Sequence, residues 1–120
     1  MIALFSLFQW NSRQRKKEVE SFFYRTMNEI FEGKYDPKEG SVFSEAFETI
    51  KEYEPRLGKK CKLLINDSSP DYTEGTALFP SGDLFYVLID RKGKSWVINQ
   101  FYHRNWGESW NDTLHSIGVR

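Results

Sequence analysis

The sequence contains a single cysteine, Cys61, and this scarcity excludes several classes of small protein. One thiol forms no disulfide within the chain and supplies no multi-cysteine zinc motif. We expect Cys61 to be a structural thiol, because nothing in the sequence sets up a local base that would activate it. The chain is therefore expected to work in a reducing compartment, which points to the cytoplasm.

Long apolar runs are also missing. Residues 1–10, MIALFSLFQW, are apolar, but they have about half the length that crosses a bilayer. They lack the preceding basic region and the small-residue cleavage site of a signal peptide, and the basic residues RQRKK follow them instead. We expect this segment to form a buried strand or to begin the first helix, and we expect no membrane partner.

The short motifs of catalysis and nucleotide binding are absent. No P-loop, GxGxxG, GxSxG or HExxH pattern occurs in the chain. The two histidines, His103 and His115, together with Arg104 are a weak signal for acid–base catalysis. The spacing of these histidines with Glu108 and Asp112 matches no metal-ligand motif. We therefore expect no catalytic residue, no metal and no cofactor, although these absences leave enzymes in general open.

The first half of the chain has the apolar periodicity of helices. Residues 13–32 predict a helix that Asn11 or Ser12 caps and Gly33 ends. Its first turn would hold four basic residues, where the macrodipole prefers acids, and an earlier start within the apolar N-terminus removes this conflict. The apolar face of this helix consists of Val19, Phe22, Phe23, Met27, Ile30 and Phe31.

A second helix is predicted over residues 42–53, with Ser41 as its cap and Pro55 as its stop. Its buried stripe is predicted to consist of Phe43, Ala46, Phe47, Ile50 and Tyr53.

The second half of the chain changes to the pattern of strands. The runs 61–66, 76–79, 84–90 and 94–102 predict an antiparallel meander of three or four strands, and 66–75 is expected to be a loop. Strand 84–90 is apolar on both faces, so both faces of the sheet need cover. The fold class is therefore α+β, a single domain over residues 1–120. Two N-terminal helices pack on the meander sheet, and a short C-terminal helix or segment follows around 108–117.

The stretch SWVINQFYHRNW (95–106) is rich in aromatic and amide side chains. Alternation predicts Trp96, Ile98, Gln100 and Tyr102 on one face, and Val97, Asn99, Phe101 and His103 on the other. It is either one strand of an aromatic core or the wall of a pocket. The candidate pocket residues are Tyr86, Trp96, Asn99, Gln100, Tyr102 and His103.

Two helices followed by a curved antiparallel sheet resemble, in the order of their elements, the cone-shaped NTF2-like domains. This resemblance implies a concave sheet face that holds a small ligand, with isomerase or hydrolase chemistry as one use of such a pocket.

Charge is unevenly distributed, although the formal net charge is zero. Residues 28–54 hold eight acidic and three basic residues. Glu45, Glu48 and Glu52 share one face of the second predicted helix, turned away from most of its apolar stripe. A row of carboxylates can mimic a phosphate backbone and occupy the cationic cleft of a nuclease. The predicted partner-binding residues are Asp36, Glu39, Glu45, Glu48, Glu52 and Glu54.

Three basic groups, Arg13–Lys17, Arg56–Lys62 and Arg91–Lys94, can converge into an anion-binding patch, but zero net charge argues against nucleic-acid binding. The main hypothesis is a non-enzymatic cytoplasmic protein that binds a basic protein. Its most concrete form is an immunity- or antitoxin-like inhibitor of a basic toxin or nuclease. The alternatives are an NTF2-like ligand pocket and, with less support, a nucleic-acid binder.

Overall fold

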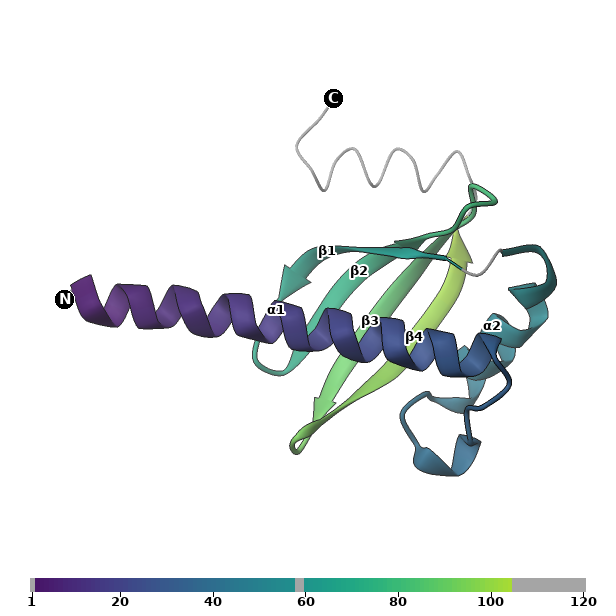
Figure 1. Cartoon of the computed structure of the whole chain (residues 1–120), viewed down its shortest axis with the longest axis horizontal. Helices are drawn as coiled ribbons and strands as arrows, with labels where there is room; N and C mark the ends of the chain where they lie inside the picture. Colours follow the sequence, from purple (N-terminus) through teal and green to yellow (C-terminus); the bar gives the residue numbers. More distant parts are fainter. Residues whose placement is uncertain (1, 58–59, 105–120) are drawn as a thin grey trace.

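The computed structural model describes residues 2–57 and 60–104 (Figure 1). Two helices and one short 3-10 turn precede four strands, which form one antiparallel sheet in the order β1-β2-β3-β4. This arrangement confirms the α+β class and the meander, while the helix predicted around 108–117 lies outside the described residues. The elements are α1 (Ile2–Phe31), η1 (Pro37–Glu39), α2 (Ser44–Leu57), β1 (Lys62–Ser68), β2 (Tyr72–Leu78), β3 (Leu84–Lys92) and β4 (Ser95–Arg104).

Helix α1 begins at Ile2, so the apolar N-terminus belongs to the helix. The basic group Arg13–Lys17 therefore lies near the middle of α1, where the charge conflict expected at a first turn does not arise. For the same reason, the prediction that Asn11 or Ser12 caps the helix is wrong.

The end of α1 and its path over the sheet position the rest of the fold. Gly33 ends the helix as predicted, with a φ of 72°, and the Lys34 N–H donates to the Glu29 carbonyl at 2.8 Å. The helix crosses one face of the sheet, and its first turns extend past the sheet (Figure 1). Among the described residues, no helix is long and apolar enough to cross a membrane.

Helix α2 starts later than predicted, because Ser41 pairs with a strand instead of capping the helix. The Ile98 N–H donates to the Ser41 carbonyl at 2.9 Å, and the Phe43 N–H donates to the Ile98 carbonyl at 2.8 Å. Residues 41–43 thus form backbone hydrogen bonds with the free edge of β4, which would otherwise be open to another strand.

Pro55 does not stop α2, contrary to the prediction, but lies inside its last turn. Proline in this position removes one backbone hydrogen bond of the helix. The final residue, Leu57, is fully buried in the hydrophobic core. Packing of Leu57 therefore holds the last turn in place despite the proline.

The segment 66–75, predicted as a loop, is mostly strand, because β1 continues to Ser68 and β2 begins at Tyr72. Its polar residues bond one another across the two strands. The Tyr72 hydroxyl donates to Asp67 Oδ2 at 2.9 Å, and the Ser68 and Thr73 hydroxyls lie 3.2 Å apart. Residue types that favour turns are thus accommodated in the sheet by cross-strand hydrogen bonds.

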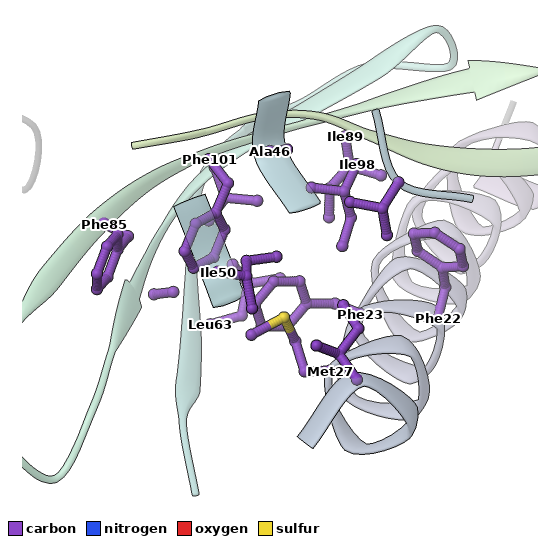
Figure 2. Packing of buried hydrophobic residues seen from close by; sticks show 14 of the residues in the cluster. Phe22, Phe23, Met27, Ala46, Ile50, Leu63, Phe85, Ile89, Ile98 and Phe101 are labelled. Carbon is purple, nitrogen blue, oxygen red and sulfur yellow. The ribbon is translucent and has the colours of Figure 1, made fainter. Parts of the chain in front are cut away.

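The hydrophobic core lies between the two helices and one face of the sheet, which we call the inner face (Figure 2). The stripe predicted for α1 is buried as expected, except that Phe31 is only partly buried. Each fully buried large side chain contributes about 1.5–3 kcal/mol by leaving water. The central core residues include Phe23 and Met27 of α1, Ala46 and Ile50 of α2, and Leu63, Phe85, Ile89, Ile98 and Phe101 of the sheet.

The opposite face of the sheet, the outer face, is also apolar, as the strand pattern predicts. Leu84 is buried there, and Tyr86 and Leu88 are partly buried. Leu64, Leu78 and Tyr102 remain exposed. The helices therefore cover the inner face, whereas the outer face keeps exposed apolar side chains on three strands.

Candidate functional site

The stretch SWVINQFYHRNW does not alternate regularly, because β4 contains a β-bulge at Asn99. Ile98 pairs with Ile89, whereas Gln100 pairs with Leu88, so Asn99 is an extra residue in the ladder. The bulge reverses the alternation for the rest of the strand. Trp96, Ile98, Phe101 and His103 consequently face the inner side together, and the predicted division of these residues between two faces is wrong.

The six candidate pocket residues are distributed over different parts of the sheet. Tyr86 and Tyr102 stack on the outer face, with ring centroids 4.8 Å apart. Trp96 lies near the β3–β4 hairpin, where the Arg91 guanidinium sits 5.1 Å from its ring centroid. His103 lies toward the other end of β4.

The remaining two candidates lie beside α2. Asn99 donates a hydrogen bond to the carboxylate of Asp90. Asn99, Gln100 and Tyr102 line a hollow of about 270 Å³ together with Glu45 and Thr49 of α2. The structure therefore brings three of the six predicted pocket residues together, and it places them next to the predicted acidic surface.

His103 is the one histidine within residues 2–57 and 60–104, and it pairs with Asp83. Its Nε2 lies 2.9 Å from Asp83 Oδ1, and its ring stacks on Tyr53 at 5.0 Å and meets the edge of Phe85 at 5.1 Å. In this part of the chain, no hydroxyl or thiol is hydrogen-bonded to His103 itself, and the Asp83 carboxylate also accepts a hydrogen bond from the Ser81 hydroxyl at 2.7 Å. Here the pair joins the start of β3 to the end of β4, while His115 lies outside the described residues.

Cys61 lies partly buried against the hydrophobic core. Desolvation raises the pKa of its thiol to about 11, which keeps the thiol protonated at neutral pH. This environment favours the structural role expected for Cys61.

The acidic residues of the middle segment are mostly on the surface. Glu45, Glu48 and Glu52 are all exposed along α2, and we call these three residues the acidic face. Asp36 and Glu39 are exposed at η1, where Asp36 Oδ1 also accepts a hydrogen bond from the Lys38 N–H at 2.9 Å. Glu54 differs, because it is partly buried and forms an ion pair with Lys51 at 2.6 Å.

Two aromatic side chains are exposed beside the acidic face. Phe43, just before α2, is 53% exposed, although it was predicted to be part of the buried stripe. Tyr102 on β4 is 49% exposed. The helix start at Ser44 explains the error, because the helical spacing used to assign Phe43 does not extend to it.

Each exposed aromatic residue shares a hollow with one glutamate of the acidic face. Tyr102 and Glu45 line the hollow of about 270 Å³ on one side of α2. Phe43 and Glu48 line another hollow, of about 370 Å³, which also includes Phe47 and Val97. The acidic face is therefore flanked by two depressions, each combining a carboxylate with an aromatic ring.

A third depression, a cleft of about 490 Å³, lies between α1 and the β3–β4 hairpin. It brings together Lys17 and Lys94, from two of the three basic groups seen in the sequence. Lys62, from the third group, lies exposed on β1 and does not line this cleft.

No family model matches the chain, and no curated protein or solved structure shows significant similarity to it.

Proposed function

We propose that this domain is a protein-binding module that docks on a basic surface of its partner through the acidic face of α2. The observation that supports this most directly is the combination of three exposed glutamates with the exposed rings of Phe43 and Tyr102. Exposed charge alone is typical of any solvated helix, whereas exposed aromatic rings next to charged residues are a feature of binding surfaces, in which aromatic anchors are surrounded by a polar rim.

The electrostatics of the acidic face favour a cationic partner. Within the described part of the chain, the carboxylates of Glu45, Glu48 and Glu52 form no ion pair. Helix geometry sets successive carboxylates about 4.5 Å and 6 Å apart along the axis of α2. Such a row attracts a basic surface during approach and fixes its orientation on contact.

The two aromatic residues provide the apolar part of the interface. Residues that dominate binding energy are typically aromatic or arginine side chains that become fully desolvated in the complex. Phe43 and Tyr102 each lie in a depression that a partner side chain can enter. We therefore expect Phe43 and Tyr102 to contribute affinity, and the glutamates to contribute association rate and orientation.

The narrower form of the proposal is an immunity- or antitoxin-like inhibitor, whose acidic face occupies the cationic active-site cleft of a toxin or nuclease. Regularly spaced carboxylates support this form, because they present negative charge as a nucleic-acid backbone does. The single free cysteine is consistent with the cytoplasmic location expected for such a protein.

The test compares two triple charge reversals of the tagged full chain. One reverses the acidic face (Glu45→Lys, Glu48→Lys and Glu52→Lys), and the control reverses three acids elsewhere (Glu20→Lys, Glu32→Lys and Asp71→Lys). A protein captured in stoichiometric amount at moderate salt is identified by mass spectrometry, purified and titrated against each variant.

We expect the partner to be basic, to bind wild type and control alike, and to lose binding when the acidic face is reversed. An acidic partner, or equal binding by both triple variants, would show that the acidic face is not the docking surface. If the partner is a nuclease or toxin, its activity must fall on titration with the wild-type chain, or the inhibitor form is wrong.

A further inference from the structure

The cleft between α1 and the β3–β4 hairpin has features of a ligand site that is separate from the acidic face. Its volume of about 490 Å³ lies within the range of small-molecule sites. Three parts of the fold form it, so its shape depends on tertiary packing. The lining residues are Gln14, Lys17, Glu18, Ser21, Phe22 and Arg25 of α1, Ser41, and Lys94, Ser95 and Trp96 of the hairpin.

The cleft gathers like charges. Lys17, Arg25 and Lys94 are exposed there, and Glu18 is the one acidic residue in the lining. In the part of the chain that the structure describes, Lys17, Arg25 and Lys94 make no ion pair or hydrogen bond. These unpaired cations give the depression a local positive charge that suits an anion.

The other lining groups complement an anion with an apolar portion. The hydroxyls of Ser21, Ser41 and Ser95 supply neutral hydrogen-bond donors from three separate segments. Trp96 and Phe22 are buried and form the apolar floor of the cleft. Arg91 stacks on the Trp96 ring, which holds the indole in place and keeps a further positive charge close by.

We propose that this cleft binds a small phosphomonoester dianion that carries a planar apolar group. Three cations against one carboxylate match two negative charges better than one. Basic side chains and hydroxyls suit the several oxygens of a phosphate group.

A small ligand fits better than a nucleic-acid strand. The chain has no net charge to attract a polyanion. Glu39 at η1 lies two residues before Ser41, which lines the cleft. A strand leaving the cleft past Ser41 would run toward this carboxylate, whereas a single phosphate would not.

The experiment uses the full chain and phenyl phosphate as the probe. Amide and indole N–H signals are followed by two-dimensional NMR, and the Trp96 indole signal is identified from its loss in Trp96→Phe. Phenol tests the ring alone, inorganic phosphate tests the anion alone, and phenyl sulfate tests the same ring with a single charge. We expect a saturable shift of the Trp96 indole with phenyl phosphate and weaker binding of the other three probes.

Neutral variants test the residues. Lys17→Gln, Arg25→Gln and Lys94→Gln are each expected to weaken phenyl phosphate binding about three- to tenfold. Lys62→Gln, an equivalent change of an exposed lysine on β1, is expected to leave binding unchanged. The proposal is overturned by the lack of a saturable shift, by variants that bind as wild type does, or by tighter binding of a single-stranded oligonucleotide through the same residues. None of these outcomes depends on whether α2 binds a protein.

Discussion

Replacing Phe85 with alanine removes the ring at the centre of the aromatic cluster on the inner face. Phe85 is fully buried. Its ring centroid lies 4.7 Å from Phe101, 5.1 Å from His103, 5.2 Å from Tyr53 and 5.4 Å from Phe79. These partners come from α2, β4 and the start of the β2–β3 connection, so the substitution loosens three parts of the fold at once.

The size of the effect follows from burial and from these ring contacts. A fully buried Phe→Ala change costs about 3–5 kcal/mol, including the cavity that it leaves. Four aromatic neighbours place Phe85 at the upper end of this range, because such pairs add about 0.5–1.5 kcal/mol beyond burial. We therefore expect Phe85→Ala to lower the free energy of unfolding by about 4–5 kcal/mol. Domains of this size have only about 5–15 kcal/mol in total.

Urea denaturation followed by far-ultraviolet circular dichroism measures this loss, with Phe85→Leu and Leu64→Ala as comparisons. Leucine keeps most of the volume and is expected to cost about 1–2 kcal/mol. Leu64 lies on the outer face and is 38% exposed, so its truncation is expected to cost about 1 kcal/mol. A loss below about 2 kcal/mol for Phe85→Ala, or one equal to that of Leu64→Ala, would refute the assignment of Phe85 to the centre of the core.

Two further predictions concern β2 and β3. A Cβ atom on Gly75 would lie 2.7 Å from the Leu64 carbonyl oxygen and 3.0 Å from Leu63 Cδ1. Gly75→Ala is therefore expected to destabilise the fold by about 1–3 kcal/mol in urea, and an unchanged midpoint would show that β1 yields without cost. Burial, followed by the nearby Glu74 carboxylate, raises the pKa of Tyr86 to about 12. Between about pH 10, where a tyrosine of the unfolded chain titrates, and the folded pKa of Tyr86, the unfolded state loses this proton first. The Tyr86 contribution to stability is thus complete below about pH 10 and is lost as the pH rises further. Because the pKa values of Tyr35 and Tyr72 are raised as well, tyrosinate absorbance should lose one of several late ionisations in Tyr86→Phe. An unchanged late phase in that variant would assign the step to another residue.

The parts of the fold that depend on periodicity could be predicted from the sequence. The stripe from Val19 to Ile30 lies on one side of a helix whatever packs against it, and it is buried as predicted. The hairpins at PSGD (80–83) and RKGK (91–94) could also be predicted, because each short connection contains a glycine that can supply a positive φ. Gly82 and Gly93 both adopt a positive φ. These features follow from local rules, which a single sequence is sufficient to apply.

The parts that depend on pairing between distant segments could not be predicted. Asn99 forms a bulge because the residues before and after it in β4 both pair with β3. The residue types in this stretch do not indicate where the extra residue falls. Serine often caps helices, but Ser41 lies beside β4, where its carbonyl accepts a hydrogen bond from the Ile98 N–H. In both cases tertiary contact overrides the local preference.

The candidate surfaces divide in the same way. The exposure of Glu45, Glu48 and Glu52 follows from helix geometry alone and was predictable. The exposure of Phe43 depends on where α2 begins, and the basic cleft depends on α1 docking beside the β3–β4 hairpin. Arg25 lies outside the three basic groups defined in the sequence. Only the folded chain places it in the same cleft as Lys94.

The neutral chain carries its opposite charges partly on separate surfaces. Acidic residues gather on α2 and η1, whereas unpaired basic residues gather at the cleft between α1 and the hairpin. At physiological salt, a charge acts over about 8 Å, so each proposed surface can attract an oppositely charged ligand locally although the whole molecule is neutral. A phosphate held in the cleft would offset the charge of Lys17, Arg25 and Lys94 and leave the acidic face as the main charged surface. Phosphate binding should therefore survive reversal of the acidic face, and the affinity for a basic partner should be the same with and without phenyl phosphate in the cleft.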